Sequence, residues 1–110
     1  VFLQCGVIVP LTQIRNGHYT AAAKVFLPIE KNDEANNIQQ LPAGTCVSIY
    51  HIGDYLSIGR SYQKLLDYCE THSLEIISDS YEFCINDYLT SRDEKEYITK
   101  IMFYVQPLEP

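Results

Sequence analysis

Hydrophobic and polar positions alternate in short segments along most of this chain, and one longer stretch has helical periodicity. The short apolar segments, rich in β-branched and aromatic residues, predict strands at residues 6–9, 19–29, 45–52, 81–86 and 97–105. Between the first two, residues 12–18 are polar and contain Asn16-Gly17, which predicts a turn. The polar residues 31–40 are typical of a linker.

The stretch that follows Gly53 predicts a helix over about residues 54–71. Asp54 is a residue type that favours the N-cap position. Apolar side chains recur three and four positions apart and so form one buried stripe. The stripe consists of Tyr55, Ile58, Tyr62, Leu65, Leu66 and Cys69. Gly59 within it costs a helix about 1 kcal/mol relative to Ala, so we expect close packing against a sheet at that position.

The two last predicted strands alternate in a way that indicates half-buried antiparallel pairing. In the first of them Tyr81 and Phe83 share one face, while Glu82 and Cys84 share the other. This region has an internal similarity to the start of the chain. When the sequence is shifted by 76 residues, residues 6–29 align with residues 82–105 without a gap. This predicts two related halves, of which the first lacks a strand and a helix.

Composition excludes several classes of protein. The chain has 110 residues, room for one domain. Fourteen acidic against eight basic side chains give a net charge of −6, which argues against nucleic-acid contact by this segment. No apolar run approaches the ~20 residues of a membrane span. No phosphate-binding loop, nucleophile motif, metal-ligand spacing or cofactor motif is present, so we expect no cofactor and no metal.

Glu82 is the ionisable residue of most interest, because it stands between two aromatic residues in a predicted strand. One interpretation is a solvent-facing side chain on a half-exposed strand. The other is a carboxylate in an aromatic-lined cavity, where it would pair with a cationic ligand, with cation–π contacts from tyrosine rings. The same carboxylate would serve as the general base of a hydrolase.

The other candidate residues are aromatic, histidine or cysteine side chains. The chain contains nine tyrosines, of which those on the helix stripe are expected in the core, while those on strands are candidates to line a cavity. The strand candidates are Tyr50, Tyr97 and Tyr104. His51 has no metal-binding or catalytic partner in its sequence context. The four cysteines lie among apolar residues and are expected to be free thiols in a reducing cytosol.

Four motifs, in this order and spacing, resemble the GyrI-like effector-binding domain, and most of all the C-terminal drug-sensing domain of MerR-type multidrug-responsive transcription regulators. The motifs are Leu41-Pro42-Ala43-Gly44-Thr45, Tyr50-His51-Ile52-Gly53-Asp54-Tyr55, Tyr62-Gln63-Lys64-Leu65-Leu66 and Ser80-Tyr81-Glu82. The resemblance is carried by residues 41–105, and residues 1–30 resemble the end of the family's first half more loosely.

The resemblance implies an α+β fold of SHS2 type, in which duplicated β-α-β-β units form an antiparallel sheet with helices on one side. Residues 1–110 would form a single effector-binding domain, with a remnant of a truncated first unit in 1–30 and the second unit in 41–106. It also implies that Glu82 meets lipophilic cations in a pocket. Positions that match other pocket residues are His51, Cys84 and Tyr97. His51 and Cys84 depart from the best-known drug sensor, which has a Tyr and an aliphatic residue there.

Three functions remain open at this point. The first is the ligand-sensing module of a cytoplasmic regulator, a homodimer whose helix-turn-helix would precede this domain and make the DNA contacts that this fragment does not. The second is a small hydrolase with Glu82 as base, since some GyrI-like proteins are hydrolases. The third is a stand-alone GyrI-like protein that inhibits or protects a protein partner.

Overall fold

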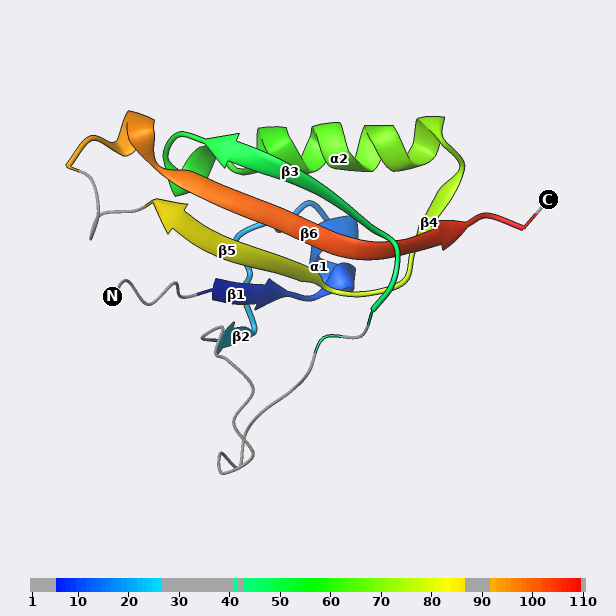
Figure 1. Ribbon diagram of the computed structural model, residues 1–110. Coiled ribbons are helices and arrows are strands. Elements are labelled where there is room, and N and C mark those ends of the chain that lie inside the picture. The colour runs from blue at the N-terminus through cyan, green and yellow to red at the C-terminus, as the bar shows by residue number, and fades with distance from the viewer. Residues whose placement is uncertain (1–5, 27–40, 42, 87–91, 110) are drawn as a thin grey trace, which may run out of the picture.

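A six-stranded antiparallel sheet with helices packed on one face forms the core of the computed structural model (Figure 1). The structure describes residues 6–26, 41, 43–86 and 92–109. The strands are β1 (Gly6–Val9), β2 (Lys24–Phe26), β3 (Cys46–Ile52), β4 (Leu74–Ile76), β5 (Ser80–Asn86) and β6 (Ile98–Pro107). The helices are α1 (Leu11–Arg15), the 3-10 turn η1 (Tyr55–Ser57), α2 (Gly59–Thr71) and the 3-10 turn η2 (Glu94–Glu96). The expected α+β class is confirmed.

The strand order β2-β1-β5-β6-β3 puts β5 near the middle of the sheet and β3 at one edge. Val7 of β1 lies opposite Glu82 of β5, and Glu82 lies opposite Ile101 of β6. Directly paired residues share a face of the sheet. On the helix-side face, Glu82 is therefore flanked by apolar side chains from both neighbouring strands.

The strand order also places the β1–β2 pair next to the β5–β6 pair, with the antiparallel strands β1 and β5 in contact. Two related halves would be arranged in this way about a twofold axis between β1 and β5. The division into repeats at residues 1–30 and 41–106 stays a prediction.

Helix α2 covers the sheet with the stripe expected from its periodicity (Figure 1). The Asp54 carboxylate caps η1 by accepting the backbone N–H of Ser57 at 3.2 Å. From there the N-cap residue Ile58 and the α2 residues Tyr62, Leu65 and Cys69 are buried against the sheet. Burying a large apolar side chain contributes roughly 1.5–3 kcal/mol, so tertiary packing rather than helix propensity holds α2 in place.

The turn predicted at Asn16-Gly17 is present, and Gly17 has a positive φ of 77° there. The sequence pattern did not predict the helix α1 that precedes this turn, which forms because the Pro10 carbonyl accepts the N–H groups of Gln13 and Ile14 and buried Ile14 anchors the helix in the core. One strand prediction in this part of the chain is wrong. The second strand does not begin at Tyr19 but at Lys24, since the Tyr19 ring stacks on Tyr62 of α2 instead of joining the sheet. Residues 27–29 and the expected linker 31–40 lie outside the described residues.

Gly59 begins α2 directly beneath the Tyr19 ring. A Cβ at this position would lie 3.1 Å from Cδ2 of Tyr19, closer than ordinary van der Waals contact. The close packing expected at this glycine is therefore present, although the neighbour is a tyrosine ring from the segment after α1 rather than the sheet.

Candidate functional site

Glu82 is completely buried, with no solvent-exposed surface. The alternation of β5 turns its side chain toward α2, while Tyr81 and Phe83 point to the opposite face, where they pack edge-on against Phe26. The interpretation of Glu82 as a solvent-facing residue is therefore wrong. A buried carboxylate is rare without a compensating partner, so its contacts decide what it can do.

Two tyrosine hydroxyls contact the two carboxylate oxygens of Glu82. Tyr55 of η1 donates to Oε1 at 2.8 Å, and Tyr62 of α2 donates to Oε2. The Tyr62 hydroxyl also lies 2.8 Å from the Oγ of buried Ser80. A phenol has one proton. When Tyr62 donates to an ionised Glu82, Ser80 donates to Tyr62, and when Glu82 is protonated the chain of hydrogen bonds can run in the opposite direction.

Burial is the main influence on the pKa values of this cluster, and no neighbouring cation offsets it among the described residues. Burial raises the pKa of Glu82, and the hydrogen bonds from Tyr62 and Tyr55 counteract part of that rise. Burial and the neighbouring Glu82 charge raise the pKa values of Tyr55 and Tyr62 far above the ordinary phenol value, so both remain protonated donors. Among the described residues, no cationic side chain contributes to the pKa of Glu82.

The Tyr62 ring is also held by a second aromatic ring. It stacks on Tyr19 with ring centroids 5.0 Å apart and an interplanar angle of 14°. Such aromatic pairs contribute about 0.5–1.5 kcal/mol beyond their buried area. Tyr55, by contrast, is only half-buried, so of the two donors it is nearer to solvent.

His51 also faces α2, but its ring has a hydrogen-bond network of its own. Nε2 lies 2.9 Å from the Asp54 carbonyl oxygen, which can only accept, so Nε2 carries the proton. Nδ1 lies 2.7 Å from Ser61 Oγ, and Nε2 is also 3.0 Å from Ser57 Oγ. These contacts tie the end of β3 to η1 and α2.

The remaining predicted residues lie on both faces of the sheet. Cys84 shares the face of Glu82, two positions further along β5, and adds to the elevated pKa of Tyr55. Tyr97 precedes β6 and accepts the Gly53 N–H through its carbonyl oxygen. Tyr50 and Tyr104 belong to the opposite face: Tyr50 is exposed, and Tyr104 packs edge-on against Tyr81. The structure thus brings Cys84 near the Glu82 cluster and separates Tyr50 and Tyr104 from it.

Sequence reasoning missed Tyr55, Tyr62 and Ser80 as members of the site, because it assigned both tyrosines to the core. One signal was available. A tyrosine on a buried helix stripe brings a hydroxyl that needs a hydrogen-bond partner. The segment that follows the helix in the sequence carries Ser80 and Glu82, whose side chains can accept such a hydrogen bond.

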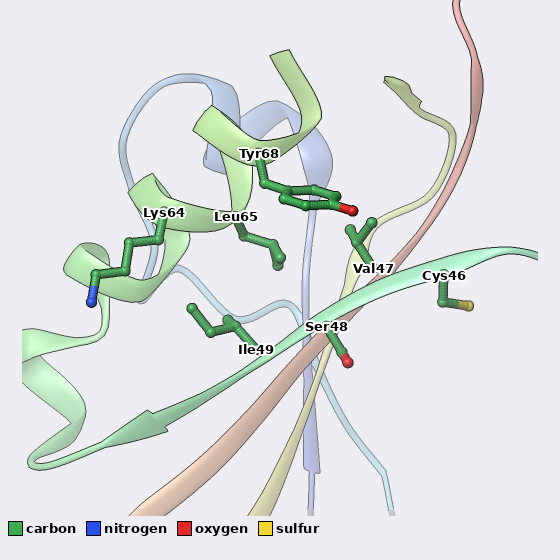
Figure 2. Close-up of a pocket in the computed structure, with 7 residues that line it drawn as sticks. All are labelled: Cys46, Val47, Ser48, Ile49, Lys64, Leu65 and Tyr68. Atoms are coloured by element: carbon green, nitrogen blue, oxygen red, sulfur yellow. The ribbon is translucent and has the colours of Figure 1, made fainter. Parts of the chain in front are cut away.

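Two pockets of the described surface lie away from this cluster. One, of about 440 Å³, lies between β3 and α2 (Figure 2). The other, of about 250 Å³, lies on the opposite face of the sheet beside Tyr81 and Tyr104. Glu82 lines neither pocket. Within the described ranges, no cluster of His, Cys, Asp and Glu has the arrangement of a metal site, and the described cysteines Cys46, Cys69 and Cys84 are not in disulfides. None of the described helices could span a membrane.

Comparison with known proteins gives the family. Residues 13–106 match the GyrI-like small-molecule-binding domain. A solved structure of the EcmrR–DNA complex contains a chain of the same fold, with a TM-score of 0.68 at 19% identity. The match covers 96% of this chain and 54% of that one, so this chain spans about half the length of its structural relative. A comparison with curated proteins gives no match. The chain belongs to the GyrI-like family of small-molecule-binding domains.

Proposed function

We propose that this domain senses hydrophobic cations and that Glu82 is the residue that recognises their charge. The observation that carries the proposal is a fully buried carboxylate whose described partners are neutral hydroxyls. In such an environment the attraction between a carboxylate and a cation is much stronger than in water. A hydrophobic cation loses little hydration on entry, so it is the ligand class that this site would favour.

In this proposal Tyr55 and Tyr62 hold Glu82 in the ligand-free state. A bound cation would take over the role of the two hydroxyl donors, and the η1 turn that carries half-buried Tyr55 would move to admit it. The displaced tyrosine rings would then offer cation–π contacts. Cys84 and Tyr97 would line the same site, as the family resemblance implies.

The arrangement favours binding over hydrolysis. A general base needs a carboxylate oxygen that can contact a water or substrate proton, whereas both Glu82 oxygens accept tyrosine hydroxyls. Binding is also what the family description names. The hydrolase hypothesis with Glu82 as base is therefore the less supported one.

In the cell, we propose, this domain forms the effector-binding part of a homodimeric, cytoplasmic, MerR-type transcription regulator. Its fold is found in EcmrR, a protein solved with DNA, of which this chain spans about half the length. A helix-turn-helix of the whole protein would contact DNA, and the ligand would bias the promoter-bound dimer toward activation. The net charge of −6 is compatible with a domain that does not itself touch DNA.

Calorimetric titration with tetraphenylphosphonium tests the sensing proposal, and tetraphenylborate is the matched probe, an anion of the same shape. We expect a micromolar Kd for the cation, about −8 kcal/mol, and no binding of the anion. Glu82→Gln should weaken cation binding at least tenfold, while Glu94→Gln on the exposed turn η2 should leave it unchanged. Equal affinity of wild type and Glu82→Gln contradicts the proposal. In the full-length regulator, Glu82→Gln should abolish the response of a reporter gene to the cation.

A further inference from the structure

Within the described part of the chain, the sheet edge formed by β3 has backbone hydrogen-bonding groups that no other strand pairs with. Among the described strands β3 pairs only with β6. The hydrogen bonds Val105 N–H to Thr45 O and Gly53 N–H to Tyr97 O show that odd-numbered residues point their backbone groups toward β6. Because bonding alternates along an antiparallel pair, the N–H and C=O groups of the even-numbered residues point outward. These residues are Cys46, Ser48, Tyr50 and Ile52.

This edge lacks the features that normally prevent strand pairing. Edge strands are usually short, or carry Lys, Pro or a bulge. β3 is seven residues long, contains no charged residue and no proline, and pairs with β6 in continuous register. At the opposite edge of the sheet, β2 has three residues and begins with Lys24. The β3 edge is therefore suited to accept a further strand.

A groove runs alongside the same edge, between β3 and α2 (Figure 2). Its volume is about 440 Å³. Val47 and Ile49 point from β3 toward Leu65 and Tyr68 of α2, while Ser48 points to the other side of the strand. Lys64, one helical turn before Tyr68, is the only charged side chain among the described residues that line the groove. A strand paired to β3 would lay alternate side chains into this groove.

We propose that the β3 edge binds an extended segment of a partner protein by strand addition, and that the segment carries an acidic and an apolar residue two positions apart. Helix α2 runs antiparallel to β3, since Ser61 contacts His51 at one end and Tyr68 approaches Val47 at the other. A segment antiparallel to β3 therefore runs with α2. Residues i and i+2 of a strand are about 6.8 Å apart, close to the ~6 Å between Lys64 and Tyr68 on the helix. The segment thus has the sequence Glu-x-Leu, in which the Glu side chain contacts Lys64 and the Leu side chain contacts Tyr68.

The site is separate from Glu82 and its test is independent of the sensing proposal. The probe is a fluorescein-labelled peptide, Thr-Thr-Glu-Thr-Leu-Thr, titrated with the whole chain and followed by fluorescence anisotropy. Its counterpart, Thr-Thr-Lys-Thr-Leu-Thr, reverses the charge. We expect saturable binding of the Glu peptide and at least tenfold weaker binding of the Lys peptide.

Two pairs of variants test the backbone hydrogen bonds and the charge recognition separately. Ser48→Pro removes an outward N–H, a change that edge strands tolerate, and should weaken the Glu peptide at least tenfold, whereas Ser48→Ala keeps the N–H and should bind it normally. Lys64→Glu should reverse the preference between the two peptides, whereas Lys24→Glu at the opposite edge should not. Circular dichroism verifies the fold of each variant, and if Ser48→Pro does not fold, the Lys64 pair decides.

Three outcomes would overturn the proposal. One is the absence of an anisotropy change up to about 1 mM protein, because a Kd above that concentration is too weak for specific recognition of a segment. Another is equal binding of the Glu peptide by both members of each variant pair. The third is a wild-type dimer in sedimentation experiments that Ser48→Pro dissociates, because a second copy of the chain, rather than a partner segment, would then occupy the edge.

Discussion

The hydroxyl of Tyr62 donates a hydrogen bond to Oε2 of Glu82, so that a helix residue and a central strand residue share one buried polar contact. The Tyr62 ring is itself stacked on the Tyr19 ring. A polar contact inside a core contributes little net stability, but it is costly to break when one partner remains unpaired. The contact therefore couples the position of α2 to the charge state of Glu82 and, in the proposed function, to the binding of a ligand there.

Removing the Tyr62 hydroxyl should destabilise the domain more than removing that of Tyr55. Tyr62→Phe keeps the ring and its stacking, but deprives both Glu82 and Ser80 of a partner. We expect a loss of about 1–3 kcal/mol in the free energy of unfolding. Tyr55 is half-buried and water can replace its hydroxyl, so Tyr55→Phe should cost less, about 1 kcal/mol. Urea denaturation measures both values.

A double-mutant cycle separates the hydrogen bond from the packing. In the Glu82→Gln background the cost of Tyr62→Phe should fall, because an uncharged amide loses less than a carboxylate when a donor disappears. An identical cost of Tyr62→Phe in both backgrounds would mean that the hydroxyl does not act through Glu82.

The stability of the domain should decrease with increasing pH because of Glu82. Burial raises the pKa of this carboxyl in the folded state above its ordinary value of 4.5. The folded state then binds the proton more tightly than the unfolded state, so the contribution of Glu82 is most favourable below about pH 4.5. It is lost as the pH rises from there through the elevated folded pKa.

Glu82→Gln removes this dependence without removing the side-chain volume. The variant should be more stable than wild type at neutral pH, and the difference should shrink as the pH falls toward 4.5. Thermal denaturation of both proteins from pH 4.5 to 8 provides the measurement. Glu94→Gln on exposed η2 serves as the control for a change in net charge. A constant difference in stability across this range would show that Glu82 is ionised throughout.

Much of the fold could be predicted from local patterns, because these act between neighbours in the sequence. The apolar stripe of α2 and the cap at Asp54 were visible in this way. The short helix α1 was not, since five residues carry too little periodicity and its stability comes from burying Ile14. The late start of β2, at Lys24 rather than at Tyr19, has the same origin: a tertiary contact with Tyr62 overrides a local strand preference at Tyr19.

The candidate site shows the same limit. Glu82 was identifiable because a charged residue between two aromatic residues breaks the apolar pattern of a strand. Tyr55 and Tyr62 were assigned to the core, and by burial Tyr62 does belong there. Their second role depends on which strand lies beneath α2. The local sequence pattern cannot show that contact, because the order of the strands in the sheet decides that β5 lies beneath α2.

We expect substitution of His51 to reduce the stability of the domain without weakening ligand binding. Both of its ring nitrogens have hydrogen-bond partners within the described structure, on Ser61, Ser57 and the Asp54 backbone. His51→Ala should therefore destabilise the domain by about 2 kcal/mol, from lost packing and unpaired hydroxyls. At a temperature where the variant is folded, we expect its affinity for tetraphenylphosphonium to stay within about twofold of wild type. A tenfold loss measured by calorimetry would place His51 in the ligand site.

The contact between Gly59 and Tyr19 predicts an unusual response to a helix-stabilising substitution. Gly→Ala in a helix ordinarily stabilises by about 1 kcal/mol. Here the new Cβ would lie 3.1 Å from the Tyr19 ring, so Gly59→Ala should gain little or should destabilise, because the ring must shift from its stack on Tyr62. In a Tyr19→Ala background the obstacle is gone, and Gly59→Ala should recover the full ~1 kcal/mol. Urea denaturation of the four proteins measures the difference between the backgrounds. If Gly59→Ala stabilises both equally, the Tyr19 ring does not restrict α2. If the effect differs, Tyr19 helps to hold the Tyr62 hydroxyl over Glu82, and Gly59 is required for that position.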